Sequence, residues 1–251
     1  MTMLEPDRAR GWHLNSTAKV AVMSFAAAVC VIAFLSAFPA FDLAVAKTFY
    51  LGGGLFAGKQ FLVVDVIRHT FSALFAAACL AAFIGLVLTR DRVRTWCNLG
   101  FTNWLFLAVC LAMGPGVVVN LGLKDHWGRA RPSQTVEFGG HKLFTPALQP
   151  ADQCDRNCSF VSGEASAMFA LFFASAVLYR RKATALIGAG IAAGMAAGLV
   201  RMSQGAHFLT DVISAGLLMG VIVLTVHLLF EAIAPDPHSA TAALPFGETP
   251  A

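Results

Sequence analysis

Long runs of apolar residues, separated by polar segments, dominate the sequence. Each run is long enough to form a helix that crosses a bilayer, which takes about 20 residues at a rise of ~1.5 Å per residue. The pattern predicts an all-α polytopic membrane protein with six transmembrane helices, at residues 20–38, 70–89, 103–123, 162–178, 183–200 and 208–230.

The segments outside these runs divide the chain into one membrane domain and two tails. Residues 1–19 and 233–251 are polar or rich in proline and small residues, so we expect tails there, the second of them disordered, around a six-helix domain at 20–232. Residues 39–68 are too polar and too broken to span, because they contain Asp42, Asp65 and three consecutive glycines. An interfacial helix followed by a turn is expected in this segment.

Basic residues in the short loops predict the orientation of the helices. Two dense clusters follow the second and fourth apolar runs, at Arg90, Arg92 and Arg94 and at Arg180, Arg181 and Lys182. Short loops rich in Lys and Arg stay in the cytoplasm. Both tails are therefore expected in the cytoplasm, and the interfacial helix and the long connection at 132–159 on the extracytoplasmic side.

Composition excludes two other classes of protein. With 57% hydrophobic and 13% charged residues, the chain has more apolar surface than a soluble domain of 251 residues could bury. The net charge of +4 comes without the dense basic tract that nucleic-acid binding requires. We therefore expect the bilayer, and not a nucleic acid, as the partner.

Two cysteines differ from the other four by their surroundings. Cys154 and Cys158 lie in the long polar connection, where an oxidising compartment would permit a disulfide bond. Metal binding is the weaker alternative, because the nearby His141 does not complete a recognised ligand spacing. A disulfide is expected.

Ionisable residues gather at one predicted end of the bundle. They belong to four helix ends that the topology places at the extracytoplasmic surface, and they are Lys124, Arg131, Glu164, Arg201, His207 and Asp211. Polar groups at this depth are costly and mark functional sites. Three cations suit a phosphate group, and Ser162 and Gly163 at a helix start can offer amide hydrogens to the same anion.

His207 and Asp211 have the spacing of a nucleophile and the residue that orients it. Four positions apart on a helix, they share a face, so the carboxylate can accept a hydrogen bond from one imidazole nitrogen. The other nitrogen is then unprotonated and can attack phosphorus, giving a phosphohistidine. By contrast, Lys59 and Arg68 stand alone at a helix end and are expected to extend toward lipid headgroups.

Two features inside the apolar runs are explained by helix packing. Pro115, between two glycines, is expected to kink the third helix, because it lacks an amide hydrogen. Gly190, Gly194 and Gly198 recur every four residues, which places small residues on one face for close approach of a neighbouring helix.

These residues resemble the motifs of the type 2 phosphatidic acid phosphatase superfamily. The first motif is Lys, six residues and Arg-Pro, matched by Lys124 and Arg131-Pro132; the third is Ser-Arg, five residues, His, three residues and Asp, matched from Arg201 to Asp211 with Val200 in place of serine. The resemblance implies that the three cations bind phosphate, that His207 is the nucleophile and that Asp211 orients it. It also implies that neither a metal nor another cofactor is needed.

The second motif departs from the family pattern. Where the family has Pro-Ser-Gly-His, this chain has Val-Ser-Gly-Glu, so Glu164 replaces the histidine that protonates the leaving alcohol. A protonated carboxyl group can act as a general acid, although neighbouring cations favour its ionised form. His126 and His141 are alternative proton donors. Glu164 could instead pair with a cation and leave the enzyme slow or inactive.

Among members of this family, the chain most resembles bacterial lipid A phosphatases, particularly those acting at the 4′ position. That resemblance implies a multi-pass protein of the bacterial inner membrane with its site facing the periplasm and a lipid phosphate as substrate. Undecaprenyl pyrophosphate and phosphatidylglycerophosphate phosphatases are the alternatives within the class. An anion transporter and a catalytically disabled lipid-binding relative are the alternatives outside it.

Overall fold

The computed structural model describes residues 6–233, which form an all-α bundle. The helices are α1 (Pro6–Ala37), α2 (Ala40–Thr48), α3 (Leu62–Leu88), α4 (Phe101–Leu111), the π-helix η2 (Ala112–Leu123), α5 (Lys124–His126), α6 (Gly163–Leu178), α7 (Ala183–Ser203) and α8 (Leu209–Ile233). Two short strands pair antiparallel, β1 (Tyr50–Gly52) and β2 (Leu55–Phe56). The 3-10 turns are η1 (Ala57–Lys59), η3 (Pro132–Gln134), η4 (Val136–Phe138) and η5 (Arg180–Lys182).

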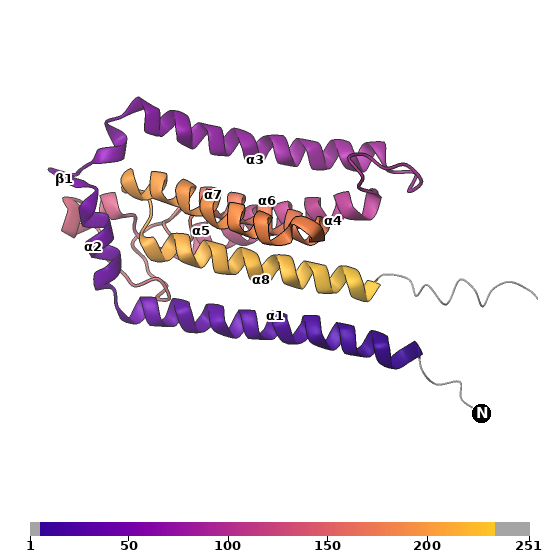
Figure 1. Ribbon diagram of the computed structural model, residues 1–251. Helices are drawn as coiled ribbons and strands as arrows, with labels where there is room; N and C mark the ends of the chain where they lie inside the picture. The colour runs from indigo at the N-terminus through magenta and orange to yellow at the C-terminus, as the bar shows by residue number, and fades with distance from the viewer. Residues whose placement is uncertain (1–5, 234–251) are drawn as a thin grey trace, which may run out of the picture.

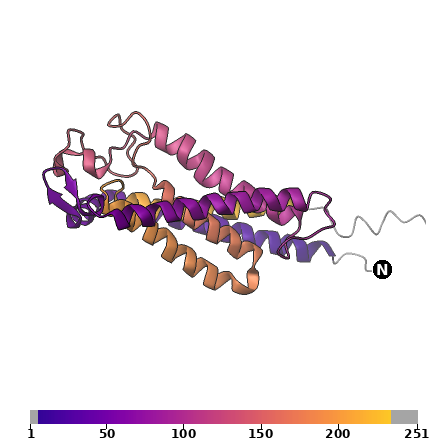
Figure 2. The same cartoon turned by 90° about the horizontal axis from the view of Figure 1, so that it is seen from above.

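The long helices run side by side, with α1 and α3 on opposite sides of the others (Figure 1). One end of the bundle, here called the loop end, carries α2, the strand pair and the connection between α5 and α6 (Figures 1 and 2). The end of α3 and the start of α7, where the two arginine clusters lie, are at the opposite end (Figure 1). The predicted separation of these clusters from the polar connection is therefore present in the fold.

Fewer than six helices of the described chain are long enough and apolar enough to cross a membrane. Among the described residues, four helices pass this test, at Leu62–Leu88, Phe101–His126, Arg180–Ser203 and Leu209–Ile233. A fifth span exists if Val22–Ala37 and α2, bent by 75°, count as one. The predicted span at 162–178 forms α6, whose 16 residues cover only about 24 Å. Six spans are therefore not confirmed, although the chain is a multi-pass membrane protein.

The short helix α6 is the centre of the bundle. Six consecutive residues, 165–170, are buried, so protein and not lipid surrounds its first half. The glycine stripe of α7 permits this packing, as predicted: a Cβ at Gly194 would meet the ring of Phe169, and one at Gly198 would meet Val212 of α8. A side chain at either position would push the helices apart.

The helix that contains Pro115 is widened over a long stretch. Instead of a single kink, residues 112–123 form the π-helix η2, in which backbone hydrogen bonds span five residues. Proline cannot donate to the normal ladder, so the helix adopts another bonding pattern around it. The widened segment ends directly at Lys124.

The segment expected to contain an interfacial helix and a turn contains α2 and the strand pair. The turn between the strands uses three glycines with positive φ, at 52–54, a conformation that other residues rarely adopt. Phe56 packs with Phe138 and Phe208 in a small buried cluster. This cluster attaches the interfacial segment to the start of α8.

The segment predicted as an N-terminal tail is largely helical. Helix α1 begins at Pro6, so residues 6–19 are helical and extend the predicted first span toward the N-terminus. The predicted C-terminal tail, apart from Ile233 at the end of α8, lies outside the described residues.

Candidate active site

The predicted site residues converge at the loop end, around a cavity of about 350 Å³. This cationic cavity is lined by Arg68, Lys124, Arg131, Glu164 and Arg201, with Phe71, Phe75 and Pro115 among its apolar lining residues. A larger cavity of about 550 Å³ lies between α6, α7 and α8 around His227, away from these groups. Its apolar lining offers no comparable set of cations, so we assign the site to the cationic cavity.

His207 is held with one ring nitrogen bonded and the other unpaired. The side chain is buried, and Nδ1 lies 2.7 Å from the carbonyl oxygen of Ser159. A carbonyl only accepts hydrogen bonds, so Nδ1 carries the proton and Nε2 has a free lone pair. Nε2 lies 4.0 Å from Oε2 of Glu164 and has no hydrogen-bond partner among the described residues. This is the tautomer that a nucleophile requires.

Burial also favours the neutral imidazole. Desolvation lowers the pKa of His207 below its ordinary value of 6.5, because it penalises the charged ring, and Lys124 acts in the same direction. The nearby carboxylates of Asp211 and Glu164 oppose this shift without cancelling it. His207 is therefore neutral at neutral pH.

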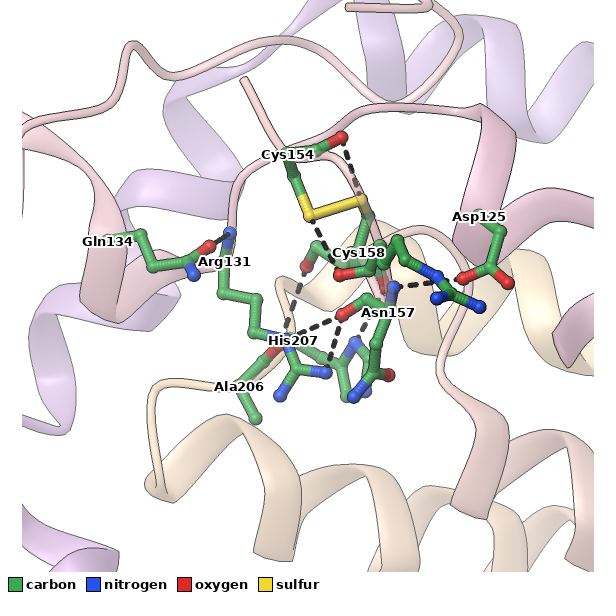
Figure 3. The surroundings of a disulfide bond; sticks show 10 residues. Asp125, Arg131, Gln134, Cys154, Asn157, Cys158, Ala206 and His207 are labelled. Carbon is green, nitrogen blue, oxygen red and sulfur yellow. Dashed lines mark hydrogen bonds between the residues drawn. A yellow bond between two sulfur atoms is a disulfide. The ribbon is translucent and has the colours of Figure 1, made fainter. Parts of the chain in front are cut away.

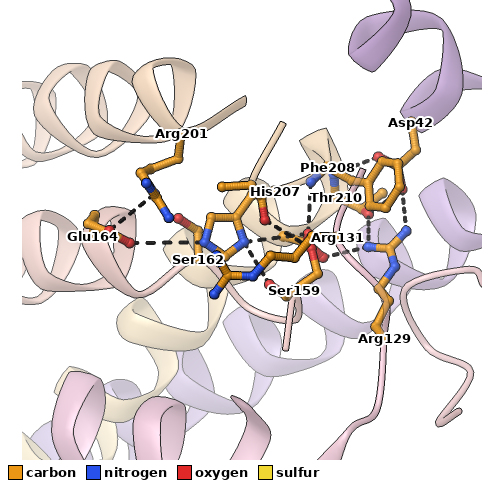
Figure 4. A network of polar contacts seen from close by, with 12 residues as sticks. Asp42, Arg129, Arg131, Ser159, Ser162, Glu164, Arg201, His207, Phe208 and Thr210 are labelled. Atoms are coloured by element: carbon orange, nitrogen blue, oxygen red, sulfur yellow. Dashed lines mark hydrogen bonds and ion pairs between the residues drawn. The ribbon is translucent and has the colours of Figure 1, made fainter. Parts of the chain in front are cut away.

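Asp211 lies beside the imidazole, but not at the predicted hydrogen-bond distance. Its Oδ2 lies 3.7 Å from Nδ1 of His207, too far for a hydrogen bond. The same oxygen instead accepts the hydroxyl of Ser159 at 2.5 Å and the amide of Phe208 at 2.8 Å. Asp211 is therefore connected to His207 through Ser159, whose carbonyl oxygen accepts the hydrogen bond of the ring (Figure 4).

A buried arginine that the sequence did not single out holds this arrangement together. Arg129 is fully buried; its guanidinium donates to Asp211 Oδ1 at 2.5 Å, to Thr210 Oγ1 at 2.9 Å and to Asp42 Oδ2 at 2.7 Å. Its Nε donates to the carbonyl oxygen of Thr145 at 2.8 Å. Figure 4 shows Arg129, Asp42 and Thr210 on one side of His207, whereas Glu164 and Arg201 lie on its other side. Arg129 therefore connects α2 to the start of α8.

The disulfide loop positions Arg131. Cys154 and Cys158 are bonded, as the sequence suggested, and close a short loop that contains Asn157 (Figure 3). The carbonyl oxygen of Asn157 accepts hydrogen bonds from Arg131 at 2.7 and 3.2 Å, and its amide donates to Asp125. The loop thus fixes the direction in which Arg131 points.

Ser162 and Gly163 contribute differently from what was expected. The amide of Ser162 is not free, because it donates to the main-chain oxygen of Asp211 at 3.2 Å. Its hydroxyl is buried without a partner among the described residues. Gly163 begins α6 and lines the cationic cavity, where a Cβ would lie 2.8 Å from Nζ of Lys124. Because Gly163 has no side chain, the ammonium group of Lys124 can lie beside it.

We expect Gly163→Ala to lower kcat/KM about 10- to 100-fold with little change in melting temperature, because misplacing a binding group by ~1 Å has effects of this size. The added methyl group meets the mobile end of Lys124 and so displaces the ammonium instead of unfolding the helix. Gly188→Ala is the matched control, since no atom lies within 4 Å of a Cβ there. Equal activity of the two variants would refute the role of Gly163.

Glu164 lies between two arginines and His207. Its Oε1 is 3.1 Å from Nε of Arg201 and 3.5 Å from Nε of Arg68, while Oε2 faces His207. Without a bound phosphate, the carboxylate therefore pairs with groups predicted to bind phosphate. His126 and His141, the alternative proton donors, are exposed and do not line the cationic cavity.

Several residues of the site carried only weak sequence signals. Arg129 stands two positions before Arg131, Ser159 closes the polar connection, and in the sequence Asp42 only interrupts an apolar segment. Arg68 was expected to reach toward headgroups but lines the cationic cavity. Only the folded chain brings these four positions to the motifs.

The chain is similar to known proteins. The model of the PAP2 superfamily matches residues 103–234. A lipid A 4′-phosphatase of Francisella tularensis subsp. novicida is 46% identical over 125 residues, which cover 49% of this chain and 56% of that relative. Lipid A 4′-phosphatases of Rhizobium leguminosarum and Rhizobium etli are 31% and 32% identical over 195 residues, 72% of this chain and 84% and 76% of theirs. No solved structure matches the chain.

Proposed function

The chain belongs to the PAP2 superfamily, and from this premise we propose that it is a membrane lipid phosphatase that hydrolyses the 4′-phosphate ester of lipid A. One observation carries the proposal: Nε2 of His207, which has no hydrogen-bond partner in the described part of the chain, lies beside a cavity lined by the three motif cations. The three relatives are all lipid A 4′-phosphatases, which favours lipid A over other phosphorylated lipids.

The proposed reaction has two steps. In the first, Nε2 of His207 attacks phosphorus, the bond from phosphorus to the sugar oxygen breaks, and that oxygen takes a proton from Glu164. In the second, Glu164 accepts a proton from water, which attacks the phosphohistidine and releases orthophosphate. Lys124, Arg131 and Arg201 bind the phosphate oxygens in both steps and neutralise the charge that develops.

Glu164 must be protonated to act as the acid in the first step. Binding of the substrate phosphate can bring about this protonation. In the present arrangement two guanidinium groups hold it ionised. An incoming phosphate competes for these cations and places negative charge beside the carboxylate, which favours protonation. The acid is thus formed when the substrate is bound.

The proposed location is the bacterial inner membrane, with the loop end in the periplasm. The disulfide at this end and the arginine clusters at the other support the orientation. Phe71, Phe75 and Pro115 on the cavity wall would contact the lipid part of the substrate, whose acyl chains stay in the bilayer.

The substrate assignment is tested with purified protein in detergent without added metal. Lipid A carrying two phosphates, undecaprenyl pyrophosphate and phosphatidylglycerophosphate are offered separately, and mass spectrometry identifies the lipid product. We expect loss of the 4′-phosphate from lipid A as the fastest reaction. Preference for either other lipid would reject the substrate, and no release from any of them would favour a transporter or a disabled relative.

The role of Glu164 as general acid predicts a loss that depends on the leaving group. We expect Glu164→Gln to lower kcat on lipid A roughly 10²- to 10⁴-fold, the usual contribution of a positioned acid. With p-nitrophenyl phosphate, whose leaving group needs no proton, the formation of the phosphoenzyme should be much less affected. Full activity of Glu164→Gln on lipid A would exclude the acid role.

The lowered pKa of His207 predicts the acid side of the pH profile. The neutral ring is the nucleophile, so kcat/KM should fall as pH decreases through a midpoint below 6.5. Because the substrate phosphate also titrates near pH ~6, the assignment needs NMR of histidine-labelled protein. We expect His207 to titrate below 6.5 with its proton on Nδ1; a proton on Nε2 or a higher midpoint would contradict this geometry.

A further inference from the structure

Three buried nitrogen atoms around the cationic cavity lack hydrogen-bond partners among the described residues. They are Nε2 of His207, Nε of Arg201 and Nε of Arg68. The first two belong to the third family motif. Arg68 lies on α3, outside the 103–234 region that the family model matches, and no motif includes it.

Arg68 occupies the junction of two cavities. It lines the cationic cavity together with Lys124 and Glu164. It also lines a smaller polar cavity of about 290 Å³, whose other lining residues include Lys59, Asp65 and Gln204. The residues common to both cavities are three arginines, Arg68, Arg131 and Arg201. Arg68 is thus placed beside two residues predicted to bind phosphate.

The contact that Arg68 makes indicates what it can bind. Its Nε is 3.5 Å from Oε1 of Glu164, the same oxygen that Nε of Arg201 approaches at 3.1 Å. A single anionic oxygen therefore lies between two guanidinium groups, which is how arginines bind the oxygens of phosphate. The other oxygen of this carboxylate is 4.0 Å from the nucleophilic nitrogen of His207.

The positive charge of the cationic cavity is larger than Glu164 can neutralise. The charged residues that line the cationic cavity are four cations, Arg68, Lys124, Arg131 and Arg201, and one carboxylate. Glu164 alone leaves three of these positive charges unbalanced, and a phosphate dianion adds two negative charges to the site. The side chain of Arg68 is 37% exposed, so its pair with Glu164 adds little to folding stability.

We propose that Arg68 is a fourth phosphate-binding residue, supplied by α3, and that the phosphate of the substrate displaces Glu164 from Arg68 and Arg201. The inference rests on the proposed function for its substrate but concerns phosphate binding itself. Released orthophosphate has the same chemistry as the phosphomonoester and is bound by the same four cations.

The test compares Arg68→Gln with Arg90→Gln. Both remove one positive charge from α3 or the loop after it, but Arg90 is exposed at the opposite end of the bundle. We expect Arg68→Gln to raise the KM for lipid A and the inhibition constant of orthophosphate about 10- to 100-fold, the effect of losing one charged hydrogen-bonding group. Arg68→Lys should lie between it and wild type, and melting temperatures should stay unchanged.

A binding measurement separates this inference from the proposed function. Calorimetric titration with orthophosphate uses His207→Ala and the double variant His207→Ala/Arg68→Gln, neither of which has the nucleophile. We expect the double variant to bind phosphate 10- to 100-fold more weakly, whichever lipid is the substrate. Equal phosphate affinity of the two proteins, or an equal loss in Arg90→Gln, would overturn the role of Arg68.

Discussion

Replacing His207 with alanine is expected to abolish phosphate release, with kcat reduced at least roughly 10³-fold, because removal of a nucleophile leaves only the binding contribution to catalysis. The variant should still fold, since the lost ring makes one hydrogen bond within residues 6–233, to the carbonyl oxygen of Ser159. Release of orthophosphate from lipid A under single-turnover conditions is the measurement.

His126→Ala is the matched control for this variant. The side chain is exposed and does not line the cationic cavity, and its Nδ1 lies 2.8 Å from the carbonyl oxygen of Gly122 in the preceding η2. We expect activity near that of wild type. Substantial activity in His207→Ala, or a loss as large in His126→Ala, would mean that another group attacks the phosphate.

Replacing Arg129 with methionine is expected to have the largest effect on stability. The substitution leaves the carboxylates of Asp42 and Asp211 buried without their cation, and breaking a buried ion pair in this way costs about 3–5 kcal/mol. We expect a comparable decrease in the free energy of unfolding, measured in detergent by denaturant titration. Activity should also fall, because Asp211 then no longer holds Ser159 in place.

Two further variants make this prediction specific. Arg129→Lys keeps the charge but cannot donate simultaneously to Thr145, Thr210 and both carboxylates, so it should be intermediate. Arg156→Met, on an exposed arginine of the disulfide loop, should change the unfolding free energy by no more than about 0.5 kcal/mol. A small effect of Arg129→Met would show that the buried network does not stabilise the fold.

Much of the site could be predicted because its residues follow local rules. The spacing of Lys124 and Arg131, and that of Arg201, His207 and Asp211, is preserved whatever the surrounding fold does. The lengths of the apolar runs also predicted where the helices lie, because a helix surrounded by lipid is recognised from its own sequence and not from its neighbours. The count of six spans is not confirmed, because α6 has only 16 residues and protein surrounds its first half.

The remaining parts depend on contacts between distant segments. Asp42 and Thr210 are 168 residues apart in sequence, and only the bend after α1 brings α2 to the start of α8. The expected hydrogen bond from His207 to Asp211 is not formed for the same reason. Ser159, from the connection between α5 and α6, bonds to both side chains instead. Arg68 could not be distinguished from a surface arginine until α3 was placed beside Glu164.

The central claim, attack by His207, is tested most directly by trapping the covalent intermediate. Lipid A labelled with ³²P at the 4′-phosphate is mixed with the enzyme, and the reaction is quenched with alkali within one turnover. We predict label that is stable in alkali, labile in acid and located on the peptide containing His207. Label on another residue, or turnover in the His207→Ala variant at the wild-type rate, would contradict it.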